Sequence, residues 1–210
     1  MSRVLPRVLL APAVVTLFVW MIVPLVMTIY FSVVSYNLMQ PGEHEFIGLE
    51  NIEYFVTDPD FGPAVVNTLV LLGSVIAITV VFGVGLALLV NEPFPGRGIV
   101  RVLLISPFFV MATVNALLWK HMMMNPIYGV LAQVSVFFGE EPIDWMTYHP
   151  LFSVIIMVAW QWLPFACLIF ITSLQSLDRE QMEAARMDGA NALQRFFYLV
   201  LPHLGRAIAV

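Results

Sequence analysis

The sequence is poor in charge. Only 11% of its 210 residues are Asp, Glu, Lys or Arg, against about 25% in an average soluble domain. Hydrophobic residues make up 60%, and the formal net charge is −5. Without a basic excess the chain has no surface that would hold the phosphates of a nucleic acid. This composition excludes a soluble enzyme, a disordered protein and a nucleic-acid binder.

Lysine and cysteine are nearly missing. The single cysteine, Cys167, lies in an apolar tract and has no partner for an internal disulfide. The single lysine, Lys120, lies between Trp119 and His121, whereas a P-loop needs a glycine-rich turn that ends in Lys and Ser or Thr. Any ATP-driven process therefore needs an ATPase encoded elsewhere. No catalytic constellation or metal-ligand spacing is present, so we expect no enzyme and no metal or cofactor in this chain.

Four apolar tracts are long enough to cross a bilayer, which takes about 20 mostly apolar helical residues. They cover residues 8–35, 65–90, 102–119 and 151–174. Backbone polar groups in hydrocarbon must be satisfied within the segment, so these tracts are predicted to be helices. The predicted fold class is all-α, a polytopic transmembrane helical bundle. A secretory signal peptide is the alternative for the first tract, although its apolar run is about twice the usual length.

The basic residues predict the orientation. Eight of the nine lie before the first tract, between the second and third, or after the fourth; only Lys120 lies on the other side. The N-terminus is therefore expected in the cytoplasm. Residues 37–63 and 121–150 are acidic or nearly free of basic residues and are expected outside. Residues 127–138 suit an interfacial or re-entrant helix, the alternative being an extra crossing.

The segment that follows the fourth tract has two sets of helix signals. Asp178 with Gln181 three residues later resembles a capping box, and Gly189 suits the left-handed residue that ends a helix. Asn191 with Gln194 suits a second cap. We therefore expect two short helices with a bend at Gly189, and we expect Pro202 to end the second.

Two alanines on the first of these helices leave its function open. Ala184 and Ala185 would let the helix lie close to a partner protein, with charged neighbours setting its register. The same residues suit an amphipathic helix that lies on the membrane surface.

The spacing in this segment resembles the cytoplasmic signature of the permeases of ABC importers. The matching positions are Glu183, Ala184, Ala185, Gly189, Leu199, Leu201 and Pro202, where the family usually has Ile at the place of Leu199. The run Asp188-Gly189-Ala190 is similar to the branch that imports sugars, polyols and related solutes. Residues 47–52 resemble a further family element after the first span.

The resemblance implies a mechanism and a set of partners. Residues 178–202, named the coupling segment below, would dock on a separate dimer of ATPase subunits that binds ATP and Mg. A second, homologous permease and an external solute-binding protein would complete an importer in a bacterial or archaeal inner membrane. The coupling residues would be Glu183, Ala184, Ala185, Asp188, Gly189, Leu201 and Pro202.

The family pattern also raises an expectation about length. Family members typically have two more spans after the signature, and residues 204–210 would begin the first of them. We therefore expect the transmembrane domain of residues 1–210 to be C-terminally truncated.

Polar and aromatic residues inside the tracts are the candidates for the solute path. A sugar needs hydrogen-bond partners and aromatic faces near the middle of the membrane. Asn115 and Gln161, with Trp160 and Trp162 beside the latter, fit this need, although such residues also commonly bond between helices. The alternatives for the whole chain are a permease for a non-carbohydrate solute and an intramembrane enzyme that acts on lipid.

Overall fold

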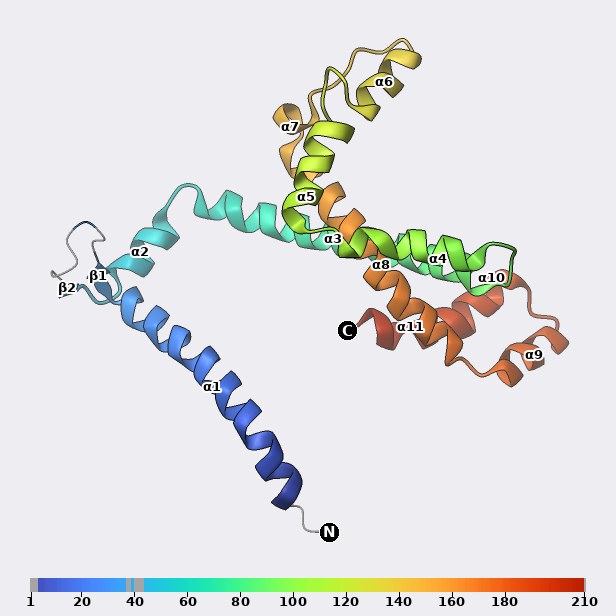
Figure 1. Ribbon diagram of the computed structural model, residues 1–210, viewed down its shortest axis with the longest axis horizontal. Coiled ribbons are helices and arrows are strands. Elements are labelled where there is room, and N and C mark those ends of the chain that lie inside the picture. Colours follow the sequence, from blue (N-terminus) through green and yellow to red (C-terminus); the bar gives the residue numbers. More distant parts are fainter. Residues whose placement is uncertain (1–3, 37–38, 40–43, 210) are drawn as a thin grey trace. The chain divides into compact units, whose positions relative to one another are not determined.

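The structure, a computed structural model, describes residues 4–36, 39 and 44–209, and it divides the chain into two units. The first unit is Met1–Val66 and the second is Asn67–Val210. Figure 1 shows that helices predominate in both and that the first unit also has two short strands.

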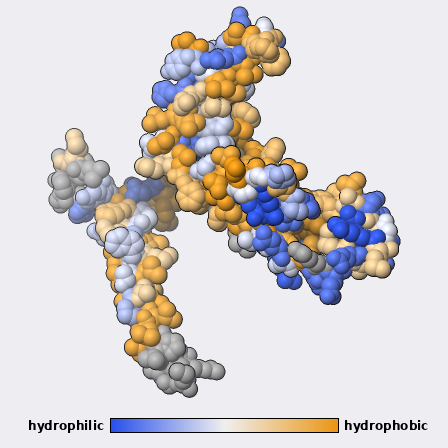
Figure 2. Space-filling view, turned by 45° about the vertical axis from the view of Figure 1, so that its right-hand side comes forward, coloured by the Kyte–Doolittle hydropathy of each residue, from blue (hydrophilic) through white to orange (hydrophobic). Residues whose placement is uncertain are grey.

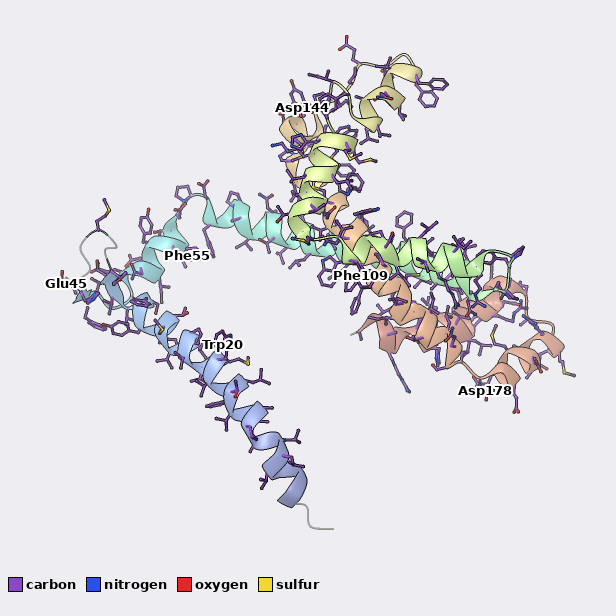
Figure 3. All side chains as sticks on the ribbon, viewed as in Figure 1. Trp20, Glu45, Phe55, Phe109, Asp144 and Asp178 are labelled. Atoms are coloured by element: carbon purple, nitrogen blue, oxygen red, sulfur yellow. The ribbon has the colours of Figure 1, made fainter. Side chains whose placement is uncertain are left out.

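The first unit is a long apolar helix followed by a small cap. Helix α1 (Val4–Ser32) has exposed side chains at every position from residue 8 to residue 31, as a helix surrounded by lipid would have. Strands β1 (Val34–Tyr36) and β2 (His44–Phe46) then pair antiparallel, and helix α2 (Glu50–Thr57) follows. Trp20 projects from the middle of α1 (Figure 3).

One asparagine attaches this cap to α1. The side-chain amide of Asn51 lies 3.2–3.3 Å from the carbonyl oxygens of Phe31, Ser32 and Val34. The last carbonyls of a helix have no partner within the helix, and Asn51 satisfies two of them at the end of α1. Gly48, with φ +62°, makes the turn that brings α2 to this position.

The second unit contains the other helices, and α3 enters it from the first. In chain order they are α3 (Phe61–Asn91), α4 (Arg97–Ile105), η1 (Ser106–Phe109), α5 (Ala112–Leu117), η2 (Leu118–Met123), α6 (Val130–Phe137), α7 (Trp145–Tyr148), α8 (Pro150–Gln175), α9 (Arg179–Met187), α10 (Ala192–Arg195), η3 (Phe196–Val200) and α11 (Leu201–Ile208). Helices α1, α3 and α8 are long and apolar enough to cross a membrane.

The core of this unit lies where α3 and α8 meet the returning helix α11. Its buried residues are Val84, Ala87, Val90, Cys167, Phe170, Ile171, Leu174, Val200 and Leu204. The helices pack closely because Gly83 leaves room for the ring of Phe170, whose atoms would lie 3.1 Å from an added Cβ. The residues before and after the coupling segment are therefore fixed in the same core as the two long helices.

The prediction of one helix over residues 102–119 is wrong. The structure has two helical pieces, Arg97–Phe109 and Ala112–Met123, that meet at an angle of 99°. Val110 and Met111 have extended backbone angles at the break, with ψ of 126° and 140°. Pro107 does not itself kink a continuous helix but begins the 3₁₀ turn η1 that leads to the break.

The apolar stretch 127–138 forms a short helix, not an extra crossing. Helix α6 has eight residues, a length of about 12 Å, whereas the hydrocarbon core is about 30 Å thick. The side chain of Asn125 makes the turn before it by accepting the backbone N–H groups of Ile127 and Tyr128. Gly129 is required there because a Cβ would lie 2.5 Å from the carbonyl oxygen of Asn125.

Candidate functional site

The coupling segment forms the two short helices that the caps predict. Asp178 precedes α9 (Figure 3), and its side chain accepts the backbone N–H of Glu180 at 2.9 Å. This bond is one residue earlier than the predicted pairing of Asp178 with Gln181. Asn191 and Gln194 form the predicted capping box, with bonds of 2.8 and 2.9 Å in both directions.

The bend between these helices lies at Gly189, as predicted. Gly189 has φ +80°, which a residue with a Cβ rarely adopts. Its N–H donates to the carbonyl oxygen of Arg186, and the N–H of Ala190 donates to that of Ala185, at 3.1 and 2.9 Å. This pair of bonds is a Schellman motif, which satisfies the last carbonyls of α9. The guanidinium of Arg195 also donates to the carbonyl oxygen of Ala190, at 2.6 Å.

The outer surface of the coupling segment is open. Glu183, Ala184 and Asp188 are exposed, and Ala185 is half-buried. Large apolar side chains lie exposed beside them: Met187 is 89% exposed, and Leu193 and Tyr198 are 69% and 78% exposed. Figure 2 shows hydrophilic residues gathered at the end of the second unit that carries this segment. The arrangement is an exposed surface on which polar and large apolar side chains are mixed.

A groove separates α9 from the ends of α3 and α8. Its volume is about 750 Å³. It is lined by Leu88, Asn91, Glu92, Pro93, Arg97, Leu174, Gln175, Leu177, Met182, Glu183, Arg186 and Val200. Among the described side chains of α9, only Met182 packs against the apolar core, so α9 is connected to the bundle mainly through its two ends.

The prediction that Pro202 ends the second helix is wrong. The helix that starts at α10 continues through η3 into α11, and Pro202 occupies the first turn of α11. Proline lacks an N–H, and its ring would clash with the carbonyl four residues earlier in a regular helix. The π-type turn η3 widens the helix before it, and the N–H of Leu201 donates to the carbonyl oxygen of Phe196, five residues back.

The predicted solute-path residues Asn115 and Gln161 lie together at the break between η1 and α5. The amide nitrogen of Asn115 donates to the Oε1 of Gln161 at 2.9 Å and to the carbonyl oxygen of Met157 at 3.2 Å. Gln161 in turn donates to the carbonyl oxygen of Val110 at 2.7 Å. Asn115 is only 4% exposed, and its Oδ1 has no hydrogen-bond partner among the described residues. The pair therefore supports the bend, and the Oδ1 of Asn115 is left without a partner among the described residues.

The two tryptophans beside Gln161 point to different neighbours. The ring of Trp160 meets that of Trp119 edge to face, with centroids 5.9 Å apart. Trp162 lies 5.9 Å from the rings of both Phe108 and Phe165 and is half-exposed. Of the four predicted residues, Trp160 borders a small pocket between α3, α4 and α8.

Three polar residues bind the C-terminal ends of α3 and α8, and none of them was singled out as a site candidate from the sequence. Arg97 and Arg101 both donate to the carbonyl oxygen of Val90, at 2.7 and 3.3 Å, and so complete the C-terminal end of α3. His203 binds the end of α8 from α11. The spacing of the arginines, four apart at the start of a helix, was a signal for the first pair. No sequence signal points to His203, because its partners lie 27 and 30 positions away.

The fold defines a class: a helical protein whose long apolar helices can cross a membrane, with an exposed pair of short helices between α8 and α11. The family model of the binding-protein-dependent transport system inner membrane components matches residues 79–210. This match covers more than half of the chain, including the whole coupling segment. The chain belongs to this family of permeases, and the predicted class and all-α fold are confirmed.

Two curated relatives cover most of the chain. The probable ABC transporter permease protein y4oQ of Sinorhizobium fredii is 37% identical over 195 residues, which is 92% of this chain and 63% of that protein. The arabinooligosaccharides transport system permease protein AraP of Halalkalibacterium halodurans is 29% identical over 206 residues, or 97% of this chain and 64% of that protein. The chain thus spans less than two thirds of the length of either.

A solved structure has the same fold. A chain of the bacterial alginate ABC transporter, crystallised in complex with an alginate pentasaccharide-bound periplasmic protein, superposes with a TM-score of 0.78. The match covers 98% of this chain and 69% of that chain at 21% sequence identity. At that identity the likeness concerns the fold alone.

Proposed function

We propose that this chain is the membrane-spanning permease subunit of an ATP-driven, binding-protein-dependent importer whose solute is a carbohydrate. Membership of the permease family supports the first part. The name of AraP, which refers to arabinooligosaccharides, and the run Asp188-Gly189-Ala190 support the second. The predicted spans at residues 8–35, 65–90, 102–119 and 151–174 cross the membrane, the third of them as the bent pair Arg97–Phe109 and Ala112–Met123. The N-terminus lies in the cytoplasm.

The observation that carries this proposal is the coupling segment. It is fixed internally by the Schellman motif and the capping box, yet its outer surface is exposed. Such a segment transmits force without unfolding, and it offers small residues at Ala184 and Ala185 for close approach. Glu183, Ala184, Ala185, Asp188, Gly189, Leu201 and Pro202 form the docking surface and its support. A separate dimer of ATPase subunits, which binds ATP and Mg, binds to this surface.

The other partners follow from the same assignment. A second, homologous permease completes the pathway, and an external solute-binding protein delivers the carbohydrate. Asn115, Trp160, Gln161 and Trp162 belong to the solute path. The Oδ1 of Asn115, which has no partner among the residues that the structure describes, would accept a hydrogen bond from a solute hydroxyl there.

The docking role is tested by charge reversal in the assembled complex. Glu183→Lys replaces an exposed acid of the signature, and solute-stimulated ATPase activity is expected to fall about tenfold through lost pairing and new repulsion at the interface. Glu180→Lys is the matched control: it makes the same change one turn earlier on α9, outside the signature, and is expected to leave stimulation within about twofold. Normal stimulation of the Glu183 variant in a fully assembled complex would refute the docking role.

The solute class is tested by uptake. Proteoliposomes with the complete complex are given labelled disaccharides, polyols, amino acids and peptides. Accumulation of an amino acid or peptide, with no carbohydrate accumulated, would contradict the assignment.

A further inference from the structure

One side chain joins the point where the chain leaves the helical core to the point where it returns. The core ends at the last turn of α8 and resumes in η3 and α11. Nε2 of His203 in α11 lies 3.0 Å from the carbonyl oxygen of Ser173 and 3.0 Å from the Oγ of Ser176. The two ends of the coupling segment are thereby tied to each other.

Chemistry fixes the direction of these bonds. A carbonyl oxygen only accepts, so Nε2 of His203 carries the hydrogen that points to Ser173. The Oγ of Ser176 donates its one hydrogen to the same carbonyl at 2.7 Å, so it accepts from His203. The imidazole is therefore a shared donor to two groups at the C-terminal end of α8, where a helix has carbonyls without partners.

Apolar contacts hold α11 in place without His203. Leu204, next in the chain, is 0% exposed, and Val200 is also buried in the core with Leu174 of α8. The hydrophobic effect behind these contacts is non-directional. The hydrogen bonds of His203 are directional, and they pair one turn of α11 with the last turn of α8.

The coupling segment has little else to hold it. None of the residues of α10 is buried, and α9 reaches the core through Met182. When a partner displaces α9, the displacement therefore reaches α8 mainly through the two ends of the segment. If these ends slid against each other, α9 would move while α8 stayed in place.

We propose that His203 is a positioning residue that clamps the two ends of the coupling segment, so that movement of α9 displaces α8. The inference rests on the proposed function, since it concerns how an ATPase drives the permease. Gln at this position keeps an N–H donor at about the place of Nε2, whereas Leu keeps the bulk and removes the donor. The pair His203→Gln and His203→Leu therefore separates the clamp from packing.

The first test measures geometry and needs no transport. Spin labels at Glu180→Cys and Tyr198→Cys, both exposed positions, are placed in a Cys167→Ala background of the assembled complex, and their distance distribution is recorded. We expect one narrow distribution for His203 and His203→Gln and a clearly broader one for His203→Leu. A narrow distribution for His203→Leu, or an equally broad one for His203→Gln, would overturn the clamp.

The second test measures coupling in the same complexes. We expect His203→Leu to lower the number of solute molecules imported per ATP hydrolysed about fivefold, the population change that one lost hydrogen bond produces. ATP hydrolysis itself should continue, and His203→Gln should restore the ratio. An unchanged ratio in His203→Leu overturns the clamp. A wild-type complex that imports no solute, with the label distances as expected, refutes the proposed function and leaves the clamp supported.

Discussion

The chain contains two sharp bends that are stabilised in opposite ways. At Gly189 every supporting bond joins residues at most five positions apart, including the bond from Arg195 to Ala190. At Val110 and Met111 the support comes from Gln161, 51 positions away, which in turn is held by Asn115. The first bend is stabilised by residues close to it in the sequence, whereas the second is stabilised only after α8 has packed beside it. The first is suited to a surface that meets a partner, the second to the interior of a membrane bundle.

The largest effect is expected from removing the long-range support. Gln161→Leu leaves the carbonyl of Val110 and the amide of Asn115 without these partners, at a cost of about 1–3 kcal/mol for each buried group. We expect a clear fall in the thermal unfolding midpoint of the purified protein in detergent.

The control for this change is Gln175→Leu, the same substitution at an exposed position near the end of α8. Its expected effect on the midpoint is within the ±0.5 kcal/mol or so typical of surface changes. Equal shifts for the two variants would show that the bond between Gln161 and Val110 does not hold the bend.

The local bend is expected to respond less, and only nearby. Gly189→Ala places a Cβ in a left-handed conformation, which costs about 1–2 kcal/mol although no atom lies within 4 Å. Hydrogen exchange of a peptide that covers α9 and α10 should therefore quicken about fivefold to thirtyfold, with the midpoint of global unfolding nearly unchanged.

The comparison for this variant is Gly205→Ala, in an open position on α11. Alanine stabilises a helix interior by about 0.5–1 kcal/mol relative to glycine, so exchange there should slow. If both alanine variants change exchange in the same direction, the left-handed conformation at Gly189 is not what the bend depends on.

This contrast also explains what the sequence could predict. The caps at Asp178 and Asn191, the bend at Gly189 and the apolar tracts follow from residues within a few positions of each other, and the structure has them. The break in segment 102–119 depends on a distant glutamine, so the apolar pattern alone predicted one helix. The π turn η3 lets the helix continue through Pro202, an adjustment of the backbone that helix propensities do not describe.

The site residues also differ in how far they could be predicted from the sequence. Asn115 and Gln161 stood out because polar side chains are rare in apolar tracts, and the structure brings them together. Their joint support of the Val110 carbonyl could not be predicted without knowing that α5 lies beside α8. The role of His203 could not be predicted, because the groups to which it donates hydrogen bonds lie 27 and 30 positions away in the sequence.

The smallest effect is expected at the second cap, and it tests how local the coupling segment is. Asn191→Ala removes the acceptor for the N–H of Gln194, which costs about 1 kcal/mol in typical caps. Exchange at the amides of α10 should quicken about fivefold, whereas exchange in α9, on the other side of Gly189, should not change. Asn191→Asp keeps a capping oxygen and should exchange like the wild type. Faster exchange of α9 in Asn191→Ala would mean that the two helices open as one unit, and the Gly189 bend would then depend on more than its own bonds.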